Sequence, residues 1–298
     1  MQPTTPFLGE ALSILTAVVW AFAVTLFRKS GETVHPLALN TFKNLLAITL
    51  LVPTILLLGQ PLILRLDITI YAALLLSGAI GIGVGDTLFF KSLNDLGAGL
   101  TGIVVCLYSP FIIAFSYLWL NENLSPLQLT GVLLIITAVL IVTIQRKAPS
   151  VSGVKIASGV VFGVLASAAM AIGVVLMKPL LDTYAVVWVA AVRLIGGMVI
   201  LIIVLLISPK RSSIMGSLFT THNRYYTVAG SFFGAYVSMV LWIAGIKYTQ
   251  ASIASALNQT STIFIFIFAG LILKEPMNMR RTIGIIMAFA GALLVCLW

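Results

Sequence analysis

Long apolar runs, separated by short polar links, dominate the hydrophobic pattern of the chain. A transmembrane helix needs roughly 20 mostly apolar residues, about 17–25 in practice. Ten runs reach this length, and we expect a spanning helix in each: Leu8–Phe27, Leu37–Leu58, Ile68–Phe90, Gly97–Leu120, Leu127–Ile144, Ile156–Met177, Tyr184–Ile207, Tyr225–Ile246, Ala251–Leu273 and Thr282–Trp298. The runs lack the apolar and polar alternation of a membrane barrel. The pattern predicts an all-α integral membrane protein.

The composition supports this prediction and excludes several classes of function. Of the 298 residues, 60% are hydrophobic and 8% are charged, whereas a soluble domain has about 45–50% apolar and about 25% charged residues. The only cysteines are Cys106 and Cys296, and the only histidines are His35 and His222. Two cysteines and two histidines are too few for a disulfide framework or a zinc cluster, and they leave little basis for a His-based catalytic set. We expect no cofactor, no metal and no enzymatic activity.

The basic residues lie mostly in the links between the apolar runs. A net charge of +9 in a soluble protein would suggest nucleic-acid binding, but here the distribution is typical of contacts with lipid headgroups, so we expect no nucleic-acid partner. Links after odd-numbered runs carry 12 Lys and Arg residues, and links after even-numbered runs carry 3. The positive-inside rule accordingly places the odd-numbered links in the cytoplasm and both termini outside.

The two halves of the chain resemble each other. An offset of 153 residues pairs Glu122 with Glu275, and each glutamate is followed nine residues later by a glycine. An offset of 150 residues pairs Lys43 with Arg193. We therefore predict a first five-helix repeat at residues 1–145, a linker at 146–155 and a second repeat at 156–298. Because five is odd, the second repeat enters the bilayer inverted, an architecture typical of alternating-access carriers.

The repeated segments carry a recognisable motif. Each half pairs an acidic link with a glycine in its last helix; the matching residues are Ser109-Pro110, Asn121-Glu122, Gly131, Lys274-Glu275 and Gly284. Together with the ten spans, this pattern resembles the EamA-type transporters of the drug/metabolite transporter superfamily. Ile263 stands where that family has a second proline. The resemblance implies cytoplasmic termini, in conflict with the charge bias, and substrates ranging from amino acids to purine-related compounds, sugar conjugates and xenobiotics.

Three charged residues fall deep inside predicted spans. An ionisable side chain there costs at least ~2.5–3.5 kcal/mol, so it needs a partner or water. Lys43 and Asp86 lie at similar depth, and we expect them to pair, either as a bridge joining two helices or as a pair for which substrate or a proton competes. Arg193 lies near the midplane, and its own half has no acid inside a predicted span. It either binds a carboxylate or phosphate or is satisfied by carbonyls or hydroxyls such as Ser231 or Ser238.

Aromatic and amide residues near mid-depth complete the candidate site. Trp20, Tyr108, Tyr236 and Asn258 are expected as cavity walls, because aromatic surfaces with a few polar groups orient small ligands; the alternative for each is helix packing. The segment "GAIGIGVGD" lacks the Gly-Lys-Ser/Thr of a P-loop, which leaves secondary transport, with protons as a candidate coupling ion. We expect an exporter of small zwitterionic or anionic metabolites across the cell membrane. The alternative is a non-transporting membrane scaffold or an intramembrane enzyme.

Overall fold

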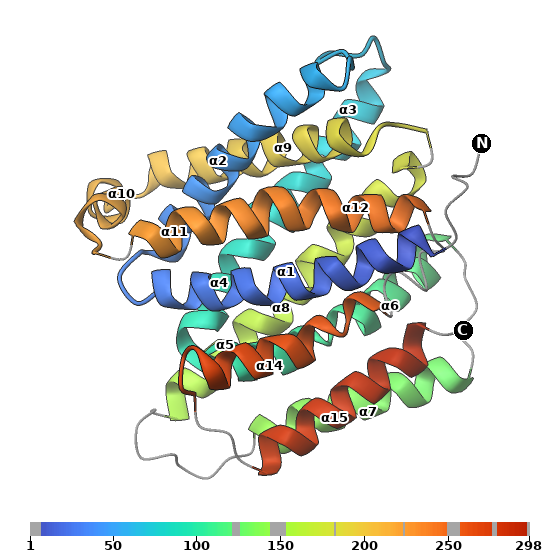
Figure 1. Cartoon of the computed structure of the whole chain (residues 1–298), viewed down its shortest axis with the longest axis vertical. Coiled ribbons are helices and arrows are strands. Elements are labelled where there is room, and N and C mark those ends of the chain that lie inside the picture. The colour runs from blue at the N-terminus through green and yellow to red at the C-terminus, as the bar shows by residue number, and fades with distance from the viewer. Residues whose placement is uncertain are drawn as a thin grey trace.

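The computed structural model describes residues 7–120, 126–143, 153–181, 183–222, 224–248, 257–275 and 279–296, and within these ranges every regular element is a helix (Figure 1). The helices of residues 7–143 are α1 (Leu8–Ser30), α2 (Pro36–Leu57), α3 (Ile68–Gly78), η1 (Ala79–Gly85), α4 (Asp86–Leu96), α5 (Ala98–Val105), α6 (Tyr108–Leu120) and α7 (Pro126–Thr143). Those of residues 153–296 are α8 (Gly153–Leu181), α9 (Val186–Ile207), α10 (Arg211–Thr220), α11 (Arg224–Ser231), η2 (Phe232–Val237), α12 (Ser238–Tyr248), α14 (Ser261–Leu271) and α15 (Met279–Cys296).

The all-α, multi-pass character predicted from the hydrophobic pattern is confirmed. In the ranges that the structure describes, six continuous helical segments are long and apolar enough to cross a membrane. They are Leu8–Ser30, Pro36–Leu57, Ile68–Leu96, Lys155–Leu181, Val186–Ile207 and Arg224–Gly245. Other apolar helices, such as Ser261–Leu271, are shorter in the described part of the chain. α1 begins and α15 ends at the same end of the bundle (Figure 1).

Two of the spanning helices contain a π-helical segment that the hydrophobic pattern does not predict. The third helix runs from α3 through η1 to α4 and ends at Leu96, six residues beyond the expected boundary. The second π-segment, η2, lies between α11 and α12. π-helical turns are rare and occur frequently at functional sites. Both segments lie in the interior of a span, where an irregular turn exposes carbonyls that need donors from elsewhere.

Helices from the two halves of the chain pack against each other. α8 contacts α3, η1 and α4, whereas α1 contacts α11, η2 and α12. α2 contacts α9, and α7 pairs with α15 at one edge of the bundle (Figure 1). Glycines permit a close approach between α3 and α9: a Cβ atom would lie 1.8 Å from the carbonyl oxygen of Arg193 if placed on Gly78, and 2.1 Å from that of Leu75 if placed on Gly196.

The link between α9 and α11 forms a short helix rather than an irregular polar connection. α10 occupies residues 211–220, has no buried residue and contacts α2 and α9. Ser217 on α10 accepts a hydrogen bond from the backbone N–H of His35 at 3.1 Å. Its apolar residues Ile214, Met215 and Leu218 are too few for a span, but they suffice to dock a surface helix.

The repeated glutamate of the second half caps a helix of the first half. The carboxylate of Glu275 accepts hydrogen bonds from the backbone N–H groups of Ala98 at 2.7 Å and Gly99 at 3.1 Å. These groups open α5, where a negative charge is stabilised by the helix dipole. Glu122, its partner in the sequence repeat, and most of the expected linker 146–155 lie outside the described residues.

Candidate functional site

Lys43 and Asp86 form the ion pair expected from their depth in the sequence. Lys43 Nζ lies 2.6 Å from Asp86 Oδ2, and their side chains are 3% and 15% exposed. Lys43 projects from the middle of α2, and Asp86 is the first residue after η1. Because both charges are largely buried, removing one partner would leave an uncompensated charge inside the protein.

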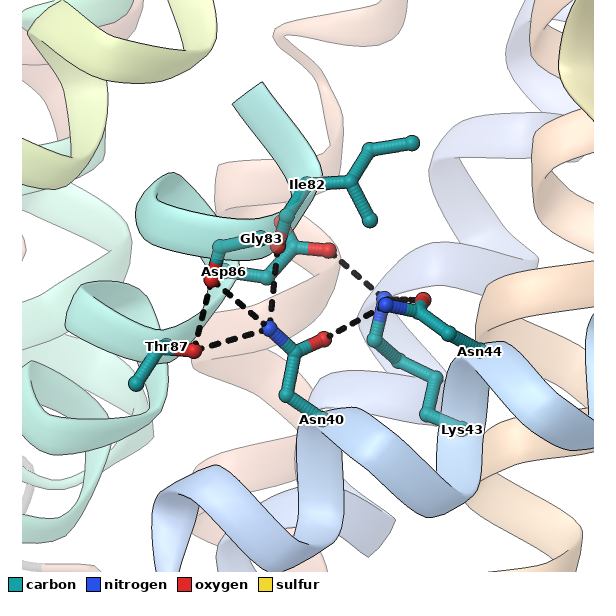
Figure 2. A network of polar contacts seen from close by, with 7 residues as sticks. All are labelled: Asn40, Lys43, Asn44, Ile82, Gly83, Asp86 and Thr87. Carbon is teal, nitrogen blue, oxygen red and sulfur yellow. Dashed lines mark hydrogen bonds and ion pairs between the residues drawn. The ribbon is translucent and has the colours of Figure 1, made fainter. Parts of the chain in front are cut away.

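A network of amide side chains surrounds this pair (Figure 2). Lys43 Nζ also donates to Asn44 Oδ1 at 3.0 Å, and Asn44 Nδ2 faces Asn40 Oδ1 at 3.4 Å. Asn40 Nδ2 in turn reaches the carbonyls of Ile82 and Gly83 and the hydroxyl of Thr87. The sequence interpretation missed Asn40 and Asn44. Their signal was available, since they are two amides one helical turn apart, flanking a lysine in an otherwise apolar run.

Arg193 is buried on α9 and is held by groups that the sequence did not indicate. Its Nε donates to Ser77 Oγ at 2.9 Å, and its Nη1 lies 2.9 Å from the sulfur of Met177. Ser77 itself donates to the carbonyl of Gly173 at 2.5 Å. The hydroxyl that meets Arg193 thus comes from the first half of the chain rather than from Ser231, whose hydroxyl donates to Thr227 within its own helix.

Among the described residues, the contacts of the Arg193 guanidinium leave its positive charge without a negatively charged partner. A serine hydroxyl carries no charge, and a thioether is only a weak acceptor. Within the described ranges, no carboxylate lies within ion-pair distance of Arg193, which is 4% exposed. Asp86 and Tyr108 are close enough for electrostatic interaction with it. The α3–η1–α4 helix therefore has Lys43 from α2 on one flank and Arg193 from α9 on another.

The remaining expected site residues are spread over several helices. Trp20 on α1 packs against Phe89 of α4 with ring centroids 5.9 Å apart. Tyr236 lies in η2 and shares a 2.8 Å hydrogen bond with Thr54 of α2. Trp20 packs with one apolar cluster and Tyr236 with another.

Asn258 has an orphaned polar atom just before α14. Its Oδ1 is buried and accepts no hydrogen bond in the described part of the chain. The next residue, Gln259, donates to Ser109 Oγ at 2.5 Å. Buried amide oxygens are normally satisfied, so Asn258 Oδ1 offers an acceptor to a bound ligand or water.

Comparison with known proteins assigns this arrangement to a family. The sequence profile of the EamA-like transporter family matches the chain twice, over residues 7–144 and 157–297. The chain belongs to the EamA-like transporter family. This membership confirms the resemblance drawn from the acidic links and glycines, and it supports a multi-pass membrane transporter.

Relatives of this EamA-like protein carry the same general description. A protein of Archaeoglobus fulgidus named "uncharacterized transporter" is 25% identical over 96% of this chain and 97% of its own length. A second, from Methanothermobacter thermautotrophicus and of the same name, is 28% identical over 76% of this chain and 64% of its own length. A solved crystal structure matches with a TM-score of 0.66 over 96% of both chains at 15% identity, which shows a shared fold.

Proposed function

We propose that this EamA-like protein is a secondary transporter that exports small organic metabolites across the cell membrane by alternating access. The substrates are amino acids or related zwitterionic or anionic compounds. The observation that carries the proposal is the pair of buried cations, Lys43 and Arg193, that flank one helix bearing Asp86. Arg193 is buried with no ion-pair partner among the described residues. Such burial is costly, and a substrate carboxylate bound through two parallel hydrogen bonds offsets that cost.

An inverted repeat of two five-helix halves is the framework proposed for this site, with boundaries at 1–145, 146–155 and 156–298. The π-segments support it, since η1 and η2 begin 153 residues apart, at the offset that pairs Glu122 with Glu275. The exchange of packing partners also supports it, because the first helix of each half lies on the π-containing helix of the other. Two halves related in this way can rock about a central site and present it to either side of the bilayer.

We assign substrate charge recognition to Arg193, Asp86 and Lys43. The guanidinium takes the substrate carboxylate, and Asp86 receives either a substrate ammonium group or a proton, in competition with Lys43. Protons are therefore the coupling ion that this site favours. Trp20, Tyr108, Tyr236 and Asn258 are assigned to the walls that surround the substrate, with the free Asn258 Oδ1 as an acceptor.

Transport by the purified protein in liposomes tests the proposal. Radiolabelled L-glutamate, L-alanine and L-lysine represent anionic, zwitterionic and cationic substrates. We expect movement of glutamate or alanine and not of lysine, with Arg193→Gln reducing the rate at least tenfold, the loss typical of one charge-assisted contact. Lys247→Gln, at the exposed end of α12, is the matched control and should transport normally.

Two further measurements address coupling and direction. An imposed pH gradient should drive substrate transport by the wild-type protein and should not drive transport by Asp86→Asn. The transport rate should also be measured in both directions in liposomes that hold the protein in one known orientation. We expect substrate to move from the cytoplasmic face to the outer face faster than in the opposite direction. Transport of lysine alone, or a normal rate for Arg193→Gln, would contradict the assignment of Arg193 to a substrate carboxylate.

A further inference from the structure

Asn40 makes an unusual set of contacts for a residue inside a membrane-spanning helix. Its side chain is fully buried on α2, three residues before Lys43. Its Nδ2 lies 2.9 Å from the carbonyl oxygen of Ile82, 3.2 Å from that of Gly83 and 2.9 Å from Thr87 Oγ1 (Figure 2). In a regular α-helix, the backbone carbonyls accept hydrogen bonds from backbone N–H groups of the same helix. Here a side chain from another helix supplies donors to the π-segment.

The contacts of Asn40 close a ring through the ion pair. From Asn40 Oδ1 the ring passes to Asn44 Nδ2, from Asn44 Oδ1 to Lys43 Nζ, and from Lys43 to Asp86 Oδ2. Asp86 directly follows η1, the segment that Asn40 itself holds. The position of η1 relative to α2 therefore sets the position of the carboxylate relative to the lysine.

The corresponding residues of the second half show that packing alone does not require this amide. At the offset of 150 residues that pairs Lys43 with Arg193, Asn40 corresponds to Ala190 and Asn44 to Leu194. Ala190 and Leu194 are fully buried, so apolar residues fill these positions on α9. At the offset of 153 residues Asp86 corresponds to Met239. The amides thus occur in the half that contains the ion pair and are replaced by apolar residues in the half that lacks the acid.

We propose that Asn40 is a positioning residue that holds η1 against α2 and thereby presents Asp86 to Lys43. The transport role of the pair rests on the proposed function, whereas the positioning itself does not. When a substrate or proton releases Lys43 from Asp86, Asn44 Oδ1 keeps a hydrogen bond to the ammonium group and Asn40 keeps the π-segment in place. The pair can then re-form with the same geometry in every cycle.

Carbodiimide labelling of Asp86 tests the positioning directly. Dicyclohexylcarbodiimide reacts with carboxyl groups in apolar surroundings, and mass spectrometry of the full-length protein in lipid nanodiscs quantifies the label on the Asp86 peptide. We expect labelling to rise about tenfold in Asn40→Ala, the factor for losing one hydrogen bond in a charged network. Lys43→Gln, which removes the ion pair, should show at least the same rise.

Two additional variants separate positioning from general loosening of the fold. Leu51→Ala removes a buried side chain of α2 that packs outside the network; it should lower the unfolding temperature while leaving Asp86 labelling at the wild-type level. Asn40→Asp keeps the shape of the side chain but loses both donors, and should label like Asn40→Ala. Wild-type labelling in both Asn40 variants, or an equal rise in Leu51→Ala, would overturn the proposal.

Labelling does not depend on transport, so the two proposals can fail separately. If Asp86 labelling rises in Asn40→Ala but the protein transports none of the three amino acids, the proposed substrates are wrong and the positioning role of Asn40 is supported. If Arg193→Gln lowers transport but Asp86 labelling is unchanged in Asn40→Ala, the proposed function is supported and the positioning role of Asn40 is wrong.

Discussion

Gly196→Ala should separate α9 from α3 and weaken the contact that holds Arg193. A Cβ atom at position 196 would lie 2.1 Å from the carbonyl oxygen of Leu75, whereas ordinary contact begins at 3.4 Å. The backbones must therefore move apart by about 1.3 Å, since the obstacle is backbone and cannot rotate away. Overpacking of this kind costs up to about 3 kcal/mol, and alanine's better helix propensity returns about 1 kcal/mol.

We therefore expect Gly196→Ala to lose about 2 kcal/mol of unfolding free energy. Ser77 lies on α3 and accepts from Arg193 Nε at 2.9 Å, so a shift of this size would also break that hydrogen bond. The measurement is thermal unfolding of the purified protein in detergent. Loss of amino-acid transport should accompany the lower unfolding temperature.

Gly216→Ala provides a matched control for this substitution. Gly216 lies in α10, and a Cβ atom there would meet no other atom within 4 Å. We expect unchanged or slightly higher stability, by up to about 1 kcal/mol, because alanine is the better helix former. Equal unfolding temperatures for Gly196→Ala and the wild type would refute the argument from the α3–α9 contact.

Three other substitutions test contacts that join distant parts of the chain. Glu275→Ala removes the cap of α5 and should cost about 1–2 kcal/mol in thermal unfolding, with Glu275→Gln costing less because the amide oxygen can still accept a hydrogen bond. Tyr236→Phe loses the hydrogen bond to Thr54 and should cost about 1 kcal/mol; in a double-mutant cycle, adding Thr54→Val should cost little more. Burial and the charge of Lys91 lower the pKa of His35 below 6.5. The unfolded chain then binds more protons just below pH 6.5, so stability should fall as the pH drops through that window, and His35→Asn should flatten this dependence of the unfolding temperature on pH.

The ion pair is the part of the candidate site that sequence reasoning predicted well. The depth of a residue in a spanning helix follows from its distance to the helix end, because each residue advances the chain by about 1.5 Å. Lys43 and Asp86 were therefore expected at similar depth, and the structure joins them at 2.6 Å. The same reasoning placed Arg193 deep in its helix but named the wrong hydroxyls as its alternative partners.

Which side chains face each other could not be derived in the same way. Lipid and protein interior are both apolar, so a spanning helix shows only a weak pattern to indicate the face that it buries. Ser77 and Met177 meet Arg193 because of the rotation of α3 and α8 about their axes. The π-segment η1 was hidden for a related reason: its glycines are compatible with a regular helix, and its carbonyls find Asn40 only after α2 has packed against it.

The sequence alone determined that this is a membrane protein of apolar helices, that its two halves resemble each other and that it carries charges at depth. The membrane character and the depth of the charges follow from hydropathy, which is summed over a segment and needs no knowledge of its neighbours. The resemblance of the halves follows from residues that recur at a fixed offset, such as Glu122 and Glu275. Only the tertiary structure decided that Asn40 braces the ion pair, that Glu275 caps a helix of the other half and that α10 lies against α2 and α9. Apart from the contact of α10 with α9, these contacts join residues more than 40 positions apart, and the packing of whole helices sets their distance.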